Sequence, residues 1–254
     1  MDTNGANLAP DGFGWRARIG VLTHDDNTVS ESELWTMAPE GVSLHAARIP
    51  FTDLSTYADP PGPENATDLL ARLSLASIIY AWTVGCYFHG RVGEQDLVTR
   101  VEKHSNGVPV VMSASAAAAG FRALGAERIA LVHAPFFSDD FDQKGVAYFR
   151  ESGFDVVHAS HLLPPIEVPH PNLGEAATPA RLYEWVRANV PSSAQAVFIG
   201  GNGFRAIGVI AALEQDLGRP VLTANQASLW YAVRQAGSDV SMTGYGRLLT
   251  SPCR

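Results

Sequence analysis

The sequence is poor in cysteine and in charged residues, and each shortage excludes a class of protein. Its 254 residues include two cysteines, Cys86 and Cys253, too few for a disulfide scaffold or for a metal site made of cysteine alone. Charged residues make up 17% of the chain, and the formal net charge is −8. Because the chain has no basic run, we expect neither nucleic acid nor an anionic membrane as a partner.

Long apolar runs and a recognisable leader are also missing. No stretch approaches the roughly 18–20 consecutive apolar residues of a membrane span. Residues 1–14 are polar, contain glycine and proline, and do not resemble a signal peptide. We therefore expect a cytoplasmic globular protein whose residues 1–14 are disordered. With 46% apolar residues, the chain has enough material for a sizeable core.

Short apolar runs alternate with helical patterns, and this alternation occurs twice. Near-continuous apolar runs are typical of strands that are covered on both faces of a parallel sheet. Strands are predicted at residues 18–23, 42–48, 77–83 and 108–113, and again at 128–133, 154–160, 195–200 and 220–224. Apolar residues at i, i+3 and i+4 predict helices at residues 67–75, 94–104, 116–124, 141–152, 179–189, 205–217 and 227–235.

The two series open on similar segments, which indicates a duplication. Arg18-Ile-Gly-Val-Leu begins the first series, and Arg128-Ile-Ala-Leu-Val begins the second. We predict an α/β fold of two pseudo-symmetric, doubly wound, flavodoxin-like lobes, each with a four-stranded parallel sheet. The first lobe is assigned residues 15–113 plus 225–254, because the last helix is expected to return to it. Residues 114–224 form the second lobe, and the active-site cleft lies between the two.

Four loops are expected to meet at this cleft, because ligands of open α/β sheets bind beyond the carboxyl ends of the strands. They are residues 23–28, 82–87, 133–137 and 200–203. The last loop, Gly-Gly-Asn-Gly, brings backbone N–H groups to a helix N-terminus, which suits an anion. A plain strand-to-helix turn explains this loop equally well. It matches neither the phosphate-binding nor the dinucleotide-binding glycine motif.

The polar residues of the first loop and the internal cysteine each have two interpretations. His24, Asp25 and Asp26 suggest metal ligation, but adjacent loop residues rarely converge on one ion, so no metal is expected. Asn27 can donate its amide to a ligand carboxylate or cap the following helix. Cys86 is either a small buried hydrophobe or a nucleophile.

Several segments together resemble a known superfamily. They include Arg18-Ile-Gly-Val-Leu-Thr with Asn27-Thr28, Tyr80-Ala-Trp-Thr, and Leu124-Gly-Ala-Glu-Arg-Ile-Ala-Leu-Val. With residues 38–48 and 219–226, these segments resemble the aspartate/glutamate racemase superfamily. The likeness is greatest to its maleate cis–trans isomerase and arylmalonate decarboxylase branches. The resemblance covers roughly residues 15–250, and it implies two lobes with the active site between them.

The same resemblance implies a departure at the catalytic positions. The family places a cysteine after the third strand of each lobe; racemases and maleate isomerases use both, and arylmalonate decarboxylases keep one. Here Trp82 and Gly201 stand at these positions. Because thiolate chemistry needs sulfur, two-cysteine catalysis is not expected. The candidate replacements for the proton donor are Cys86, His24, Asp25 and Asp26.

What the resemblance retains is a site for a carboxylate. Backbone N–H groups and hydroxyls of the family's oxyanion-binding segments stabilise negative charge, and its asparagines contact the substrate carboxylate. The expected substrate-binding residues are Asn27, Trp82, Thr83, Val84, Phe136, Phe137, Asn172, Gly201, Asn202 and Gly203. The aromatic members would line an apolar pocket. Alternatively, Trp82 only fills the space vacated at Gly201.

We predict a cofactor-independent, isomerase-like enzyme that acts on a small carboxylate or carboxylate-like compound. Its enolate-type intermediate would be held by backbone donors. A decarboxylase, lyase or hydrolase of the same superfamily is the alternative, and so is a non-catalytic module that binds a small ligand. The expected partner is a small anionic substrate, without a cofactor or metal, and a homo-oligomer is left open.

Overall fold

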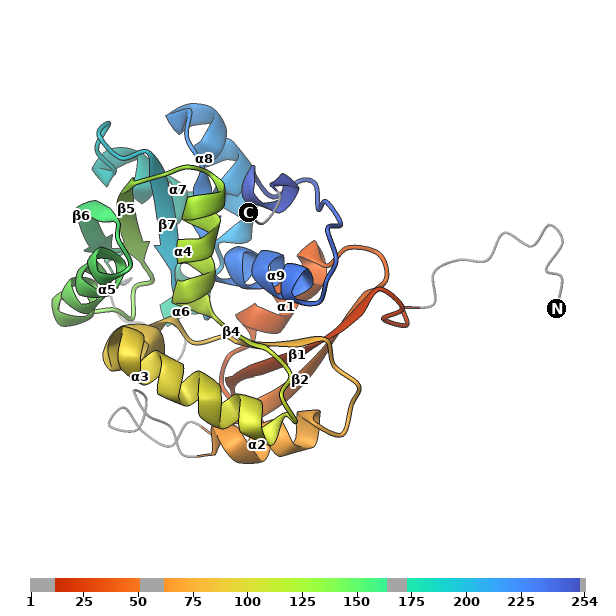
Figure 1. Ribbon diagram of the computed structural model, residues 1–254. Helices are drawn as coiled ribbons and strands as arrows, with labels where there is room; N and C mark the ends of the chain where they lie inside the picture. Colours follow the sequence, from red (N-terminus) through yellow and green to blue (C-terminus); the bar gives the residue numbers. More distant parts are fainter. Residues whose placement is uncertain (1–11, 51–61, 164–172, 252–254) are drawn as a thin grey trace, which may run out of the picture.

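Two four-stranded parallel sheets form the framework of the protein (Figure 1). The computed structural model describes residues 12–50, 62–163 and 173–251. The strand orders are β2-β1-β3-β4 and β6-β5-β7-β8. The strands are β1 (Ala17–His24), β2 (Val42–Ile49), β3 (Ser77–Tyr80), β4 (Val110–Met112), β5 (Arg128–His133), β6 (Asp155–His161), β7 (Ala196–Gly200) and β8 (Val221–Thr223). The equivalent orders confirm the predicted α/β fold with two doubly wound lobes.

Helices connect the parallel strands and cover the sheets. They are α1 (Val29–Met37), α2 (Pro63–Leu70), α3 (Thr83–His104), α4 (Ser113–Ala123), α5 (Asp139–Glu151), α6 (Leu173–Ala176), α7 (Pro179–Asn189), α8 (Ile210–Leu217) and α9 (Ala224–Gln235), with short 3₁₀ turns η2 (Ile207–Val209) and η3 (Leu248–Thr250). Every residue of β3 and β7 is buried. Strands covered on both faces explain why the apolar runs were continuous and not alternating.

The largest difference from the predicted elements lies after β3. That strand ends at Tyr80, and α3 begins at Thr83, whereas the sequence predicted a strand over residues 77–83 and a helix only from residue 94. The helix is kinked at Gly90, where φ is +62°. Because the first part of α3 is apolar and buried, its sequence does not show the alternation of polar and apolar residues that marks a surface helix.

Helices α4 and α9 lie in the middle of the molecule, between the two sheets (Figure 1). They contact each other, and α9 also contacts β3 and β4 of the first sheet and β7 and β8 of the second. Ser77 of β3 donates a hydrogen bond to the Ala232 carbonyl of α9 at 2.9 Å. The last helix therefore returns to the first sheet while it also covers the second. The boundaries predicted for the two lobes stay a prediction.

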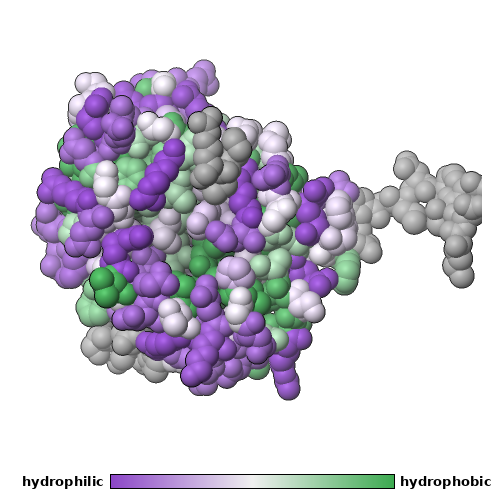
Figure 2. All heavy atoms as spheres, in the orientation of Figure 1, coloured by the Kyte–Doolittle hydropathy of each residue, from purple (hydrophilic) through white to green (hydrophobic). Residues whose placement is uncertain are grey.

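Hydrophilic residues cover most of the face shown in Figure 2, and apolar residues gather mainly towards its middle. Of the segment expected to be disordered, only residues 12–14 are described, and there the Arg18 guanidinium lies 5.4 Å from the centre of the Phe13 ring. Within the described ranges, no helix has the length and apolar character to cross a membrane.

Candidate functional site

A small cavity lies where loops of the two lobes meet. It is lined by His24, Asn27, Ala81, Trp82, Thr83, Val84, Phe136, Gly201, Asn202 and Gly203. His24 ends β1 and the others follow β1, β3, β5 or β7, so each of the four loops expected at the cleft contributes to the cavity. The cavity volume is about 20 Å³, which is room for one water molecule.

Most of the expected substrate-binding residues line this cavity, including both Trp82 and Gly201. Phe137 does not; it is buried behind the lining, with its ring stacked on His133 at a centroid distance of 4.7 Å. Asn172 lies outside the described residues. Of the candidate proton donors, only His24 lines the cavity, whereas Asp25 and Asp26 are exposed.

Asn202 joins the two lobes through both ends of its buried side-chain amide. Its Oδ1 accepts hydrogen bonds from the Thr83 backbone N–H at 3.0 Å, the Thr83 hydroxyl at 2.8 Å and the Ser113 hydroxyl at 3.0 Å. Its Nδ2 donates to Asn225 Oδ1 at 2.9 Å. The Thr83 donors expected to hold a substrate carboxylate therefore already hold the Asn202 oxygen. A ligand reaches them only by displacing it.

Glu33 completes these bonds from the opposite side. Asn225 Nδ2 donates to Glu33 Oε2 at 2.8 Å, and Glu33 Oε1 accepts the backbone N–H groups of Ala206 at 2.6 Å and Ile207 at 3.0 Å. Burial raises the pKa of Glu33, although these hydrogen bonds act in the opposite direction. We call Glu33, Asn225, Asn202, Thr83 and Ser113 the Asn202 network.

Packing fixes the Trp82 ring in the lining of the cavity, and its indole N–H has no acceptor among the described residues. Its ring stacks on Tyr80 at a centroid distance of 5.4 Å and meets the His24 ring edge-on at 5.6 Å. A Cβ atom at Gly85 would collide with the indole, so this ring position requires glycine one turn later. The buried Trp82 N–H has no hydrogen-bond partner among the described residues. Because a buried donor without an acceptor is costly, we expect a water or a ligand oxygen to accept from it.

Gly201 has a backbone conformation that favours glycine, with φ at +119°. A Cβ atom there would lie 2.7 Å from the Ala134 Cβ and 3.3 and 3.5 Å from ring atoms of Phe136 and Phe137. These are the three nearest atoms, and none belongs to Trp82. Phe136, Phe137 and Ala134 thus take up the space beside Gly201, which does not support the alternative that Trp82 fills it.

His24 is the titratable side chain among the residues that line the cavity. Burial lowers its pKa to about 4, although the charge of Asp25 acts in the opposite direction. The imidazole is therefore neutral near neutral pH. A neutral imidazole can accept a proton from a carbon acid, and the imidazolium that forms is then paired with the negative charge left on the carbon acid.

Cys86 is buried one helical turn beyond Trp82 and does not line the cavity. Its Sγ lies 3.3 Å from the Trp82 carbonyl oxygen. Burial and the nearby Glu94 charge raise the pKa of the thiol well above its ordinary value. A thiol in these surroundings stays protonated, and this geometry favours the interpretation of Cys86 as a small buried hydrophobe.

The sequence did not reveal a second buried polar chain, which crosses from α3 to the second lobe. Burial lowers the pKa of His133, so this neutral ring donates from Nδ1 to Asp142 Oδ1 at 2.6 Å, and its Nε2 accepts from the Tyr87 hydroxyl at 3.1 Å. Asp142 Oδ2 accepts from His161 Nδ1 at 2.7 Å. Burial pushes the pKa of Asp142 upward, but the two histidine bonds outweigh it and leave this pKa below its ordinary value.

This series of buried hydrogen bonds also explains why a group of possible metal ligands lies together in the second lobe. Ligand atoms of Asp139, Asp142 and His161 lie within 4.8 Å of one another. Both Asp142 oxygens already accept histidine N–H groups, so hydrogen bonding explains the arrangement. The sequence could not reveal these contacts, because residues that lie far apart along the chain are brought together only by the fold. Asn225, in contrast, lies within residues 219–226, one of the segments that carried the resemblance.

Comparison with known proteins finds relatives of similar length. The family model for arylmalonate decarboxylase matches residues 64–249. A maleate isomerase of Geobacillus stearothermophilus is 25% identical over 249 residues, covering 92% of this chain and 97% of that protein. An arylmalonate decarboxylase of Bordetella bronchiseptica is 25% identical over 190 residues, covering 73% and 77%. A mutant maleate cis-trans isomerase of Nocardia farcinica, with a covalently bound succinylcysteine intermediate, superimposes with a TM-score of 0.82 at 24% identity, covering 92% and 98% of the two chains.

Removal of the Asn202 side chain tests the Asn202 network. Asn202→Ala leaves the donors of Thr83 and Ser113 buried without this acceptor, so we expect the free energy of unfolding to fall by about 3 kcal/mol. Asn189→Ala is the control, because Asn189 is only half-buried and donates one hydrogen bond, to the Trp185 carbonyl. Its expected loss is below about 1 kcal/mol. Urea unfolding of both variants measures the difference, and equal losses would contradict the bridging role of Asn202.

Alkylation of the native protein tests the state of Cys86. Because the thiol is buried and its pKa is raised, iodoacetamide should leave Cys86 unmodified in the folded protein and modify it completely after unfolding. Mass spectrometry of the peptide that contains Cys86 gives the extent of reaction. Rapid modification of this residue in the native state would return it to the list of candidate nucleophiles.

Proposed function

Because the chain belongs to the arylmalonate decarboxylase family, we propose that it is a cofactor-independent enzyme acting on a small carboxylate or carboxylate-like compound. The reaction passes through an enolate-type intermediate and uses no thiol. The observation that carries this proposal is the buried Trp82 N–H, which has no partner among the described residues, in a side chain that lines a cavity shared by both lobes. Its relation to maleate isomerases and arylmalonate decarboxylases supports an isomerase or a lyase.

Donors around the start of α3 suit a negatively charged intermediate. The first N–H groups of a helix have no partner within the helix, and in α3 these belong to Thr83, Val84 and Gly85. The Thr83 N–H is taken by Asn202, which leaves Val84 and the Trp82 indole beside the cavity. The positive end of the helix dipole adds to their effect. Fixed donors of this kind stabilise charge that develops on an enolate oxygen.

His24 is the group we assign to proton transfer. Bases with a pKa near 4 are strong enough for enolate chemistry when donors stabilise the enolate. One such group can remove a proton from carbon and return it, as in an isomerisation. Racemisation by two opposed groups and thiolate addition to a double bond have no support among the described lining residues, because His24 alone titrates there and Cys86 lies elsewhere.

Decarboxylation is the second candidate. Loss of carbon dioxide from a malonate-type substrate breaks the carbon–carbon bond and leaves the enolate directly. One proton from water, passed on through a single group, then forms the carbon–hydrogen bond of the product. The family model and the single titratable residue in the lining both favour it. The cavity as it stands has room for one water, so either reaction requires the lobes to part or Trp82 to turn when substrate binds.

Turnover in D₂O tests the proposal. The purified protein is mixed with malonates, dicarboxylates, hydantoins and lactones, and proton NMR follows deuterium uptake at carbon and product formation. We expect deuterium next to a carboxylate, with His24→Gln lowering the rate by about 100-fold or more while binding persists. Trp82→Phe removes the indole donor and should weaken binding. His104→Gln, on the exposed end of α3, is the matched control with unchanged rate.

Two results would contradict the proposal in different ways. A ligand that raises the melting temperature but gives neither exchange nor product supports the non-catalytic binding module. Exchange that persists at the wild-type rate in His24→Gln moves the proton transfer to another residue.

The pH dependence of turnover provides an independent test of His24. The active form is the neutral imidazole, so kcat/KM should stay constant below neutral pH and fall as the pH drops through about 4. The unfolded chain binds this proton at higher pH than the native protein does, so stability also declines as the pH falls from 6.5 towards 4. Circular dichroism at each pH separates inactivation from unfolding. An acid limb centred near 6.5 in the folded protein would contradict the assignment.

A further inference from the structure

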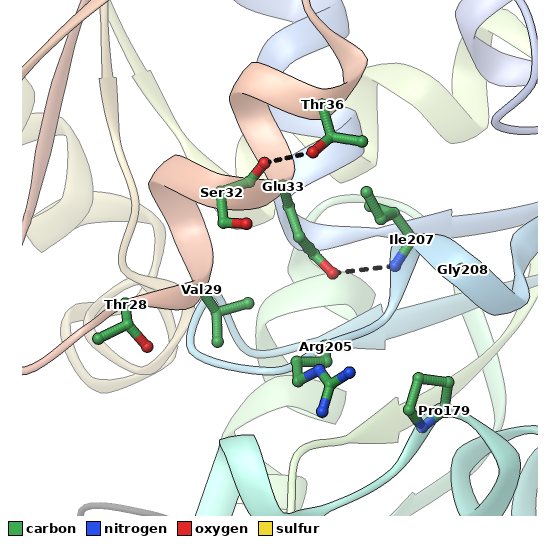
Figure 3. Close-up of a pocket in the computed structure, with 9 residues that line it drawn as sticks. All are labelled: Thr28, Val29, Ser32, Glu33, Thr36, Pro179, Arg205, Ile207 and Gly208. Atoms are coloured by element: carbon green, nitrogen blue, oxygen red, sulfur yellow. Dashed lines mark hydrogen bonds between the residues drawn. The ribbon is translucent and has the colours of Figure 1, made fainter.

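A groove of about 470 Å³ lies between α1 and the segment that leads from β7 into η2. Figure 3 shows Val29, Ser32 and Glu33 of α1 on one side and Arg205 and Ile207 on the other. No residue lines both this groove and the cavity. Its volume falls within the range of about 300–1,000 Å³ that is typical of small-molecule sites.

Arg205 is unusual among the arginines of the described ranges. The others, apart from Arg72, donate a side-chain hydrogen bond or form an ion pair. In Figure 3 the guanidinium of Arg205 lies within the groove, between Val29 and Pro179. A guanidinium has five N–H donors in a planar fork. In the part of the chain that the structure describes, none of these donors has an acceptor.

Glu33 faces the same groove but does not occupy these donors. Its oxygens accept the N–H groups of Ala206, Ile207 and Asn225. The charge of Arg205 lowers the pKa of Glu33 only as the smallest of several influences, and burial outweighs it. The groove therefore presents a cation whose hydrogen-bonding capacity is unused. Thr28 and Ser32, which carry hydroxyl groups, also line it.

The other residues that line the groove indicate which kind of anion it can bind. Val29 and Ile207 give the groove apolar walls on either side of Arg205. Helix α1 begins at Val29, which lines the groove, so the positive end of its dipole lies nearby, although Asn27 Oδ1 already accepts from the N–H groups of Val29 and Ser30. Carboxylate and phosphate groups match the fork of a guanidinium with two parallel hydrogen bonds. A small oxyanion attached to an apolar body satisfies all of these features.

We propose that this groove binds a small molecule through a carboxylate or phosphate group, which Arg205 holds with two hydrogen bonds. The apolar body of the ligand covers Val29 and Ile207, and the hydroxyls of Thr28 and Ser32 contact the remaining oxygen atoms. The site is separate from the cavity, and its existence does not depend on the reaction proposed above.

An NMR titration of the full chain tests this site. Sodium benzoate, sodium succinate and inorganic phosphate are added in turn to ¹⁵N-labelled protein, and the backbone signals of Ser32, Ile207 and Gly208 report on the groove. The signals of Val84 and Gly203 report separately on the cavity. We expect saturable shifts at the groove signals, and benzoate against phosphate shows which oxyanion is preferred.

Substitutions of arginine give the decisive comparison. Arg205→Gln should weaken the affinity at the groove signals by about tenfold or more, because a charged pair with two hydrogen bonds is lost. Arg205→Lys keeps the charge but not the fork, and an intermediate loss is expected. Arg72→Gln is the matched control, because Arg72 is an exposed arginine that also lacks a partner among the described residues.

Either of two outcomes overturns the proposal. The first is the absence of saturable shifts at Ser32, Ile207 and Gly208 with all three anions. The second is an Arg205→Gln protein that binds as tightly as Arg72→Gln. Melting temperatures of the three variants show that each remains folded, which is expected because both arginines are on the surface.

Discussion

The buried amide of Asn202 is the interaction on which the arrangement of the two lobes depends. A side-chain amide inside a protein must satisfy its oxygen and its nitrogen together, and this one does so with Thr83 and Ser113 on one side and Asn225 on the other. Only a few relative positions of the two lobes allow all of these hydrogen bonds to form at once. The network therefore fixes the lobes, and through them the cavity, more strictly than apolar packing between helices α4 and α9 would.

The same network also sets the conditions under which the cavity can work. The donors that begin α3 are suited to an anion, yet the N–H and hydroxyl of Thr83 already donate to the Asn202 oxygen. A carboxylate that binds at the start of α3 takes the place of the neutral Asn202 oxygen as the acceptor. Charge-assisted hydrogen bonds then replace neutral ones. Displacement of Asn202 would also break its bond to Asn225, which ties ligand binding to the separation of the lobes.

The sequence predicted the framework well and the polar interior poorly. The strand at residues 128–133 and the helix at residues 179–189 match β5 and α7 at both ends, because apolar patterning decides local structure there. The four loops at the cavity followed from sheet topology. Glu33, Ser113 and His133 were not foreseen, because a buried polar residue looks like any surface polar residue until the fold supplies its partner. The proton-transfer roles of Cys86, Asp25 and Asp26 stay predictions, although none of the three lines the cavity.

Trp82 and Gly201, which the resemblance places at the cysteine positions of the family, lie in surroundings that fit the residues present. The Trp82 ring occupies its place only because Gly85 leaves room for it, and Gly201 has a left-handed backbone conformation with Ala134 against it. A cysteine at residue 201 would be strained and would meet Ala134, while a cysteine at residue 82 would leave a void beside Tyr80. The surrounding backbone and packing thus fit tryptophan at residue 82 and glycine at residue 201 better than cysteine. We therefore expect the chemistry of this site to come from the hydrogen-bond donors and the imidazole that line the cavity.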